Sequence, residues 1–201
     1  MSEEIKYIKN FYNKHAKRWT SKPADPFYHE TPFRKFEKLL KPGNTVLDIG
    51  CAGGIHAPLF LGIGKKLKYE GIDISEKMIG IAKSRYPQLK FSTTDLVNFK
   101  SKKRFSGFWA AAVLMHIPEK DLGKALTNIE KITKPKAIGY ITLPITRPNE
   151  ENEKDKRHFT LYTINDFKKL TKARGWKILN SGSLNSKNKE LIWNWYIVKL
   201  P

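Results

Sequence analysis

Strand-type and helix-type segments alternate through the middle of the chain, and this alternation most narrows the folds open to it. Apolar runs typical of buried parallel strands are followed by stretches whose apolar residues recur at helical spacing. Connections between parallel strands are right-handed, so the pattern predicts an α/β fold, an open and mostly parallel sheet with helices on both faces. The expected strands are 45–49, 69–74, 89–93, 107–113 and 137–143, and the expected helices 54–61, 75–85 and 119–132.

The two ends of the chain depart from this rhythm. Over the first 20 residues, apolar and aromatic side chains recur at helical spacing between lysines, which predicts an amphipathic helix. A second short helix is expected to begin at Thr31 and to stop at Pro42 and Gly43. Beyond residue 143 we expect a charged loop over 144–158, a helix over 163–173, and antiparallel strands over 176–180 and 191–199.

Size and composition limit the class of protein. A length of 201 residues predicts one domain, and a hydrophobic share of 40% excludes general disorder. The longest apolar run, residues 108–115, is too short for a bilayer-spanning helix, and the N-terminus has no apolar signal core. We therefore expect no membrane insertion and a cytoplasmic location. The single cysteine, Cys51, allows neither an internal disulfide nor a multi-cysteine zinc site.

Basic residues greatly outnumber acidic ones. The chain has 38 Lys and Arg against 19 Asp and Glu, a net charge of +19. Such a field attracts polyanions, so nucleic acid is a candidate partner. The lysines are spread over every segment, however, and this distribution favours a generically basic, solvated surface.

Residues 46–54, VLDIGCAGG, have the pattern of a ligand-binding turn. An apolar strand runs into small residues, which allow a ligand close to the backbone, and the following helix presents free amide groups. Ile55 occupies the position where a dinucleotide fingerprint needs a third small residue, so NAD is disfavoured. Asp48 at the strand end favours a ligand with a cationic group nearby.

Two further aspartates lie at the end of the second expected strand and just after the third. Asp73 lies in GIDIS, where its carboxylate can accept both hydroxyls of a ribose, and Asp95 lies in TTDL, where it can face the exocyclic amine of an adenine. Taken singly, such residues are more often helix caps or turn residues. Their conjunction with the glycine turn predicts a nucleoside site.

The segments VLDIGCAGG, GIDIS, TTDL and FWAAAVLMHIP resemble the class I S-adenosylmethionine-dependent methyltransferases over nearly the whole chain. The resemblance implies a Rossmann-like three-layer sandwich with a seven-stranded, mostly parallel sheet whose last strand is antiparallel. It implies one domain over 1–201, with residues 1–40 as a helical lid and 144–201 as a C-terminal helix and β-hairpin. The implied cofactor is S-adenosyl-L-methionine, and the implied product is S-adenosyl-L-homocysteine.

Carried over to this sequence, the family pattern implies a set of cofactor-binding residues. Two positions depart from it: Ala52 stands where a glycine is usual, and Ser106 where an acidic residue usually precedes the fourth strand. The implied contacts are Asp48, Gly50, Cys51, Ala52, Gly53, Asp73, Ile74, Met78, Asp95, Leu96 and Ala111.

The tail, with Arg157 followed by HFTLYT, resembles a bacterial subgroup related to ubiquinone-biosynthesis and tellurite methyltransferases. That subgroup acts mostly on small molecules, so we expect a small-molecule acceptor and a monomer or homodimer. Two alternatives remain. An RNA methyltransferase is supported by the charge and by a loose likeness of RHFTLY and WNWY to wobble-uridine tRNA methyltransferases, and a non-catalytic module would bind the cofactor only.

Methyl transfer from a sulfonium mainly requires positioning, and a proton acceptor is needed only for a protonated nucleophile. His116, directly after the fourth strand, is the candidate base, although it can equally serve to shape the pocket. Tyr12 and Trp19 on the N-terminal helix are expected to contact the cofactor or the cleft.

The acceptor side has its own candidates. We expect Arg157 and Tyr162 there, because a guanidinium can hold a carboxylate or a phosphate; Tyr28, His29 and His158 are weaker candidates. Cys51 lies inside the turn, which argues against a thiol nucleophile. No cluster has metal-ligand spacing, so no metal ion is expected.

Overall fold

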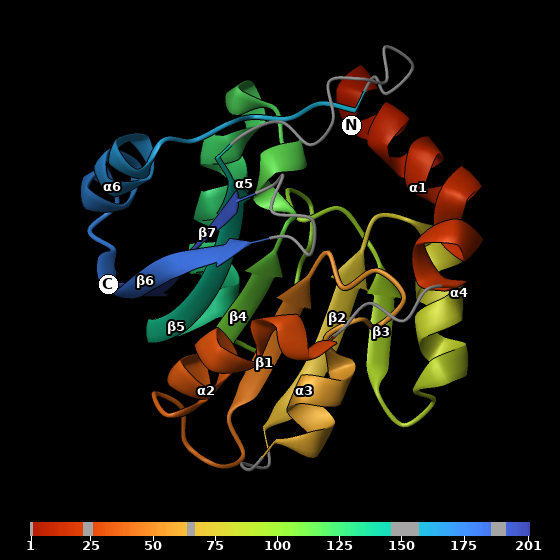
Figure 1. Ribbon diagram of the computed structural model, residues 1–201, viewed down its shortest axis with the longest axis horizontal. Coiled ribbons are helices and arrows are strands. Elements are labelled where there is room, and N and C mark those ends of the chain that lie inside the picture. Colours follow the sequence, from red (N-terminus) through yellow and green to blue (C-terminus); the bar gives the residue numbers. More distant parts are fainter. Residues whose placement is uncertain (1, 22–25, 64–66, 146–156, 186–191) are drawn as a thin grey trace.

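The computed structural model describes residues 2–21, 26–63, 67–145, 157–185 and 192–201. These residues form a seven-stranded sheet with the order β3-β2-β1-β4-β5-β7-β6 (Figure 1). The strands β1 to β5 run parallel to one another, whereas β7 is antiparallel to both β5 and β6, so the expected topology is confirmed. The strands are β1 Thr45–Ile49, β2 Lys68–Asp73, β3 Lys90–Thr93, β4 Phe105–Ala111, β5 Thr133–Pro144, β6 Lys177–Asn185 and β7 Ile192–Lys199.

The helices of the described residues agree with the expected order but differ at their ends. The expected helix 54–61 begins only at Ala57, because the preceding residues form the turn. The expected strand 107–113 ends at Ala111, because Ala112 takes a positive φ of 55°. The helices are α1 Glu3–Ser21, α2 Glu30–Glu37, α3 Ala57–Gly62, α4 Glu76–Arg85, α5 Glu119–Ile132 and α6 Ile164–Ala173, with 3₁₀ turns η1 Pro26–His29 and η2 Leu114–His116.

The C-terminal part also differs from the expectation. Strand β5 follows α5 directly and begins at Thr133, before the expected start at residue 137. Strand β6 extends to Asn185, beyond the expected end at residue 180. Leu191, the expected start of the last strand, lies outside the described residues, as does most of the expected loop 144–158.

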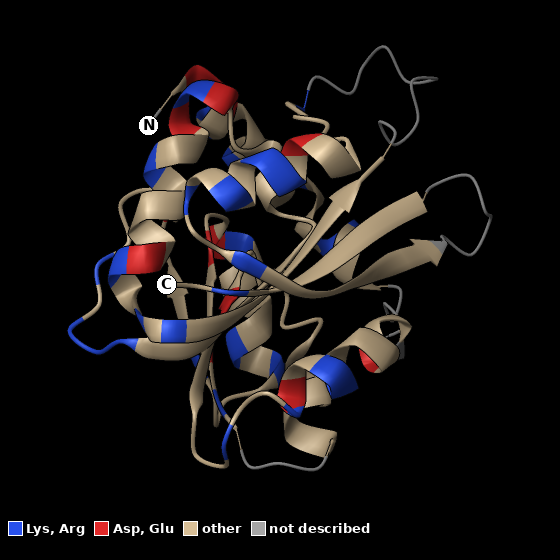
Figure 2. Cartoon of the chain, turned by 90° about the vertical axis from the view of Figure 1, so that its left-hand side faces the viewer, with Lys and Arg blue, Asp and Glu red and all other residues tan. Residues whose placement is uncertain are grey.

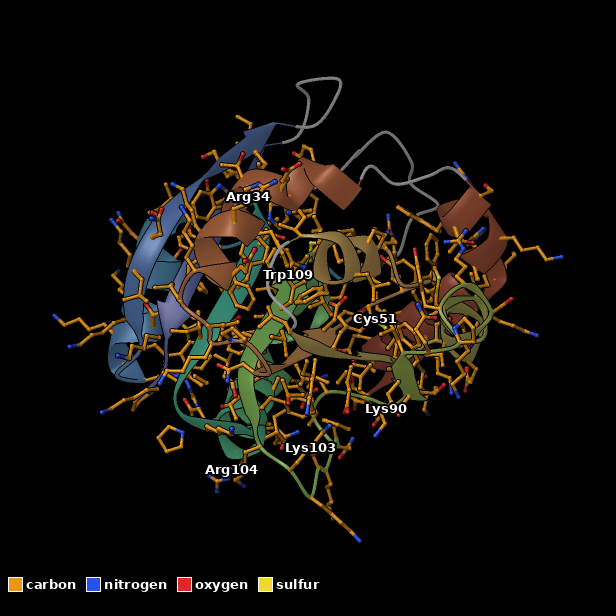
Figure 3. All side chains as sticks on the ribbon, turned by 90° about the horizontal axis from the view of Figure 1, so that it is seen from below. Arg34, Cys51, Lys90, Lys103, Arg104 and Trp109 are labelled. Atoms are coloured by element: carbon orange, nitrogen blue, oxygen red, sulfur yellow. The ribbon has the colours of Figure 1, made fainter. Side chains whose placement is uncertain are left out.

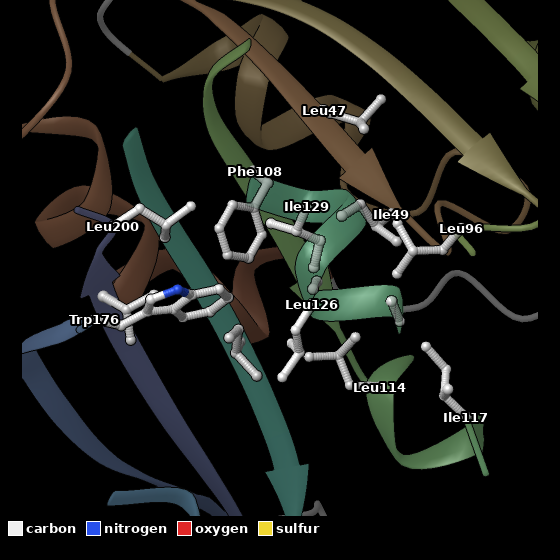
Figure 4. Close-up of a cluster of buried hydrophobic side chains, with 14 of the residues drawn as sticks. Leu47, Ile49, Leu96, Phe108, Leu114, Ile117, Leu126, Ile129, Trp176 and Leu200 are labelled. Atoms are coloured by element: carbon white, nitrogen blue, oxygen red, sulfur yellow. The ribbon is translucent and has the colours of Figure 1, made fainter. Parts of the chain in front are cut away.

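Two apolar cores, one on each face of the sheet, produce the expected three layers. Helix α5 packs on one face, where Phe108, Leu126 and Ile129 are buried (Figure 4). Helices α2, α3 and α4 cover the other face, where Phe33 and Phe60 contribute to the core. Burial of these side chains stabilises the domain by roughly 1.5–3 kcal/mol per large apolar residue.

Helix α1 lies beside α4, above the carboxyl ends of the parallel strands (Figure 1). Asn13 connects the two helices, because its Oδ1 accepts hydrogen bonds from Ser75 Oγ (2.7 Å) and from the amide of Lys77 (3.2 Å). Since these groups belong to the first turn of α4, Asn13 adds a second cap to a helix start already capped by Ser75. The N-terminal helix is thereby fixed over the edge of the sheet at which β1 to β4 end.

Basic side chains occur on helices and loops at several sides of the molecule (Figure 2). Lys90, Lys103 and Arg104 gather where β3 and β4 begin, visible from below in Figure 3. That end is opposite the carboxyl ends of the strands. The positive charge is therefore not confined to the end of the sheet that faces α1.

Candidate functional site

The turn between β1 and α3 is built so that backbone comes close to neighbouring segments. Gly50 has φ of 72° and Gly54 φ of 77°, a region that disfavours side chains. The amides of Gly50 and Cys51 donate to the carbonyl oxygen of Ile72 at 2.8 and 3.0 Å. A Cβ on Gly50 would lie 2.6 Å from Val113 Cγ2, so only glycine fits there. Ala52 also has a positive φ, 48°, at the position where the family pattern has glycine.

Asp73 ends β2 and joins this turn to the next loop. Its Oδ2 accepts a hydrogen bond from the amide of Ala52 (2.9 Å), and its Oδ1 accepts one from the amide of Ser75 (2.8 Å). Burial raises the pKa of Asp73, and the amide hydrogen bonds oppose that shift. An ionised carboxylate offers about four lone-pair sites, so each oxygen can accept a further hydrogen bond.

Asp95 and Leu96 follow β3 and form the next part of the same edge. Asp95 Oδ1 accepts from the amide of Val97 at 3.1 Å, and Oδ2 accepts from Asn98 Nδ2 at 2.9 Å. The side chain therefore stabilises its own turn, the ordinary role of an aspartate at a strand end. Leu96 is buried beside it.

A cavity of about 300 Å³ lies above the ends of β1, β2, β3 and β4 and beneath α1. It is large enough for a small-molecule ligand. Most of the site residues expected from the sequence line it: Tyr12, Trp19, Gly50, Cys51, Ala52, Asp73, Ile74, Met78, Asp95, Leu96, Ala111 and His116. The structure thus brings together residues from segments that lie far apart in the sequence.

Four expected site residues lie outside the cavity wall: Asp48, Gly53, Arg157 and Tyr162. A Cβ on Gly53 would lie 2.6 Å from Thr20 Cγ2, so this glycine faces α1 instead. Tyr162 packs against the core on the α5 side, where burial raises its pKa to about 12.

Asp48 was expected beside a cationic group, but its carboxyl lies behind the cavity wall. The residue is fully buried, with Tyr69 Oη donating to its Oδ2 at 2.7 Å and His56 Nδ1 at 3.9 Å from the same oxygen. Its Oδ1 has no hydrogen-bond partner among the described residues. Burial raises the pKa of Asp48 to about 8, so the group is mostly protonated at neutral pH.

This burial predicts a pH-dependent stability. Between pH about 4 and about 8 the unfolded chain releases a proton that folded Asp48 keeps, so the free energy of unfolding falls by about 1.4 kcal/mol per pH unit as pH rises. An asparagine side chain cannot ionise, yet its carbonyl oxygen can still accept from Tyr69. We expect Asp48→Asn to gain stability relative to the wild type between pH 5 and pH 8, measured by urea unfolding.

Asp166→Asn is the matched control. The pKa of Asp166 is lowered by its hydrogen bond from Thr163, so its ionisation affects stability only below pH about 4. The stability difference between this variant and the wild type should therefore stay constant from pH 5 to 8. Parallel curves for Asp48→Asn and the wild type would contradict the assigned protonation of Asp48.

Two histidines form one polar end of the cavity. His29 Nδ1 lies 2.8 Å from Tyr140 Oη, and its ring centroid is 5.1 Å from that of His56. Burial lowers the pKa of His29 to about 4 and lowers that of His56 well below its ordinary value. Both imidazoles are therefore uncharged at neutral pH. His29 was a weaker candidate from the sequence, whereas His56 was missed.

His116 and Tyr12 also line the cavity and contact each other. Tyr12 Oη lies 2.9 Å from His116 Nε2, and His116 Nδ1 lies 2.9 Å from the carbonyl oxygen of His158. A carbonyl can only accept, so in the neutral imidazole Nδ1 donates and Nε2 accepts from the tyrosine hydroxyl. Two hydrogen bonds thus fix the ring and its tautomer.

Arg157 does not reach the cavity wall but lies behind Tyr12. Its Nη1 donates to Tyr12 Oη at 3.1 Å, and its guanidinium lies 4.6 Å from the ring centroid of Phe11 and 5.5 Å from that of Trp19. Such contacts between a guanidinium and aromatic faces are attractive. The segment after residue 156 is thereby joined to α1.

The apolar part of the cavity wall was not expected from the sequence. Ile5, Ile8 and Ile55 line the cavity, as do Val113 and Ile117 in the loop after β4. The helical spacing of Ile5, Ile8 and Tyr12 was the available signal, because it places all three on the buried side of α1. In the described part of the chain, no group of three or more His, Cys, Asp or Glu could hold a metal ion, and no helix is long and apolar enough to cross a membrane.

The sheet order and the cavity at the carboxyl ends of β1 to β4 agree with the fold and the site that the resemblance to class I S-adenosylmethionine-dependent methyltransferases implies. A family model described as a methyltransferase domain matches residues 46–136. The segment that matches contains the glycine turn, Asp73, Asp95 and His116.

Two curated proteins with similar sequences are also named as methyltransferases. Trans-aconitate 2-methyltransferase of Sinorhizobium medicae is 32% identical over 78 residues, 39% of this chain and 30% of that protein. The corresponding protein of Rhizobium meliloti is 29% identical over 112 residues, 56% of this chain and 41% of that protein. The matches thus span less than half the length of these relatives.

Solved structures share the fold over the full chain. The 1,6-didemethyltoxoflavin-N1-methyltransferase of Burkholderia thailandensis has a TM-score of 0.80 at 14% identity, covering 100% of this chain and 91% of that one. Magnesium protoporphyrin IX methyltransferase of Synechocystis has a TM-score of 0.75 at 15% identity, and the match covers 99% of this chain and 100% of that one.

Proposed function

We propose that this protein is a methyltransferase that transfers a methyl group from S-adenosyl-L-methionine to a small-molecule acceptor. One observation carries the proposal: a single cavity joins the glycine turn, the Asp73 carboxylate and the Asp95–Leu96 turn at the ends of three adjacent strands. These are the three parts that a sulfonium nucleoside needs, in the order of its methionine, ribose and adenine.

The residues present fit this cofactor. Asp73 is held by two backbone amides and retains lone pairs for the hydroxyls of a ribose. Leu96, Ile74 and Met78 provide apolar walls for a purine, and Gly50 to Ala52 allow close approach of the methionine part. Trp19 and Tyr12 cover the site from α1, and we propose residues 1–40 as its lid.

When bound, the cofactor supplies a methyl group that its positive sulfur has already activated. The protein's task is then to hold the acceptor in line and to exclude water, and such positioning contributes about 7–11 kcal/mol. The uncharged imidazoles of His29 and His56 offer hydrogen bonds for an acceptor at one end of the cavity. Their lack of charge avoids the desolvation that a buried ion would require.

A small-molecule acceptor is favoured over RNA. The named relatives and neighbours act on compounds such as trans-aconitate and 1,6-didemethyltoxoflavin. Basic side chains also lie at the opposite end of the sheet, so the positive charge is not confined to the end that holds the cavity (Figure 3). A non-catalytic cofactor-binding module stays the alternative if no acceptor is methylated. A cytoplasmic location and a monomer or homodimer stay predictions.

The proposal is tested in two steps. Calorimetry should detect binding of S-adenosyl-L-homocysteine, whereas NAD should give no heat. Next, labelled S-adenosyl-L-methionine is incubated with the protein and either a small-metabolite extract or bulk tRNA. We expect label in the metabolite fraction. Label confined to tRNA would refute the small-molecule acceptor, and no heat with the homocysteine product would refute the cofactor.

A further inference from the structure

Tyr12 holds a position between the cavity and two polar groups. It lines the cavity, and its hydroxyl lies 2.9 Å from His116 Nε2 and 3.1 Å from Arg157 Nη1. These groups come from α1, from η2 after β4, and from the segment that begins at Arg157. Three distant parts of the chain therefore converge on one phenol oxygen.

The hydrogen-bond directions define a path for a proton. The carbonyl oxygen of His158 fixes the proton of neutral His116 on Nδ1, so the Nε2 lone pair faces the Tyr12 hydroxyl. Both ring nitrogens of His116 are engaged in this arrangement. The oxygen of Tyr12 is thus the atom of the pair that an acceptor in the cavity can reach without displacing the ring.

We propose that Tyr12 is a catalytic residue that accepts the proton of the nucleophile and passes its own proton to His116. This inference rests on the proposed function. As the nucleophile bonds to the methyl carbon and the electron pair of the methyl–sulfur bond stays on sulfur, the nucleophile's proton moves to Tyr12 Oη. The hydroxyl proton of Tyr12 moves to His116 Nε2. Tyr12 ends neutral, and His116 carries the positive charge.

The surroundings support each position of the proton. Arg157 donates to Tyr12 Oη and so stabilises negative charge that develops on this oxygen during the transfer. The hydrogen bond to the carbonyl of His158 holds the Nδ1 proton and stabilises the imidazolium formed at the end. Arg157 acts here as a positioning residue, because it contacts Tyr12 and not the cavity.

The first experiment reads the hydrogen-bond path without any turnover. Long-range proton–nitrogen NMR on the ligand-free protein distinguishes the two tautomers of each of its five histidines, and His116→Asn identifies the signals of His116. We expect a proton on Nδ1 of neutral His116, and a shift of its Nε2 resonance in Tyr12→Phe. A proton on Nε2, or an Nε2 resonance that Tyr12→Phe leaves unchanged, would overturn the proposed path.

The second experiment measures methyl transfer into the metabolite fraction. We expect Tyr12→Phe and His116→Asn each to lower the rate about 100-fold or more at saturating cofactor, the range of general acid–base catalysis. Because the two residues act as one relay, the double variant should be no slower than the slower single variant. Tyr7→Phe, on the same helix with its ring stacked on Phe11, is the control and should keep the full rate.

The outcomes separate the inference from the function. If the wild type transfers label and Tyr12→Phe transfers it equally fast, Tyr12 is not catalytic although the proposed function holds. A loss of rate explained by weaker binding of S-adenosyl-L-homocysteine would assign Tyr12 to cofactor binding and also overturn the inference. If the wild type binds this compound but labels no molecule, the proposed function fails and the inference with it.

Discussion

Replacing Asp73 with alanine should weaken the binding of S-adenosyl-L-homocysteine by about 100-fold or more, because two hydrogen bonds to a charged group contribute about 1.5–3 kcal/mol each. The carboxylate also accepts hydrogen bonds from the amides of Ala52 and Ser75, so its removal leaves two backbone donors of the site without their acceptor. Calorimetry on the purified variant measures the loss, and circular dichroism shows whether the protein remains folded.

Asp73→Asn separates the two roles of this side chain. Asparagine keeps one carbonyl oxygen for an amide of the turn but loses the charge, so we expect an affinity between those of the wild type and Asp73→Ala. Ser183→Ala is a control far from the cavity, since the Ser183 hydroxyl donates to Asn194 in the β6–β7 hairpin. An affinity of Asp73→Ala equal to that of the wild type would remove the main support for a ribose at this position.

The fold could be predicted from the sequence because apolar periodicity determines which segments become buried. The exact ends of helices and strands could not be predicted, because they depend on backbone conformations that apolar periodicity does not encode. Ala112 ends β4 with a positive φ, while its amide donates to Thr142 Oγ1 at 2.8 Å, a contact across 30 residues. The late start of α3 was likewise hidden, because the turn extends past Gly54 to His56.

The site was predictable where a motif places the backbone, and less so where burial decides the role of a side chain. Asp48, Asp73 and Asp95 have the same pattern in the sequence, an acidic residue at or just after a strand end. Only the last two line the cavity, because Asp48 points to the face of the sheet that carries Tyr69 and His56. A strand alternates its side chains, but sequence alone does not say which face the ligand occupies.

Long-range contacts account for the remaining differences. Arg157 was expected at the acceptor, yet the structure places it on Tyr12, 145 residues away in the chain. His29 is likewise positioned by Tyr140, 111 residues distant. No local pattern encodes such pairs, because they depend on how α1 and η1 pack over the finished sheet.

Trp109→Ala should lower the stability of the protein by about 3–5 kcal/mol, the range for removing a large buried aromatic side chain. Trp109 is fully buried in β4, with its ring stacked on Tyr140 at a centroid distance of 3.7 Å. The rings of Phe33 and Phe36 of α2 pack against the Trp109 ring, with centroid distances of 5.5 and 5.4 Å. The deletion therefore leaves a cavity between the sheet and α2. Urea unfolding followed by far-ultraviolet circular dichroism measures the change without relying on tryptophan fluorescence.

Trp109→Phe should lose much less stability than Trp109→Ala. Phenylalanine retains an aromatic ring for Tyr140 and removes the indole Nε1, a buried donor that has no hydrogen-bond partner within the described residues. Leu61→Ala, at a side chain that is 50% exposed, is the control and should change stability little. If Trp109→Ala unfolds at the same urea concentration as Leu61→Ala, the core beneath His29 and His56 is not what holds α2 on the sheet. The rings of His29 and His56 pack against Trp109 at centroid distances of 6.1 and 5.7 Å, so Trp109→Ala should also disorder the part of the cavity that these histidines line.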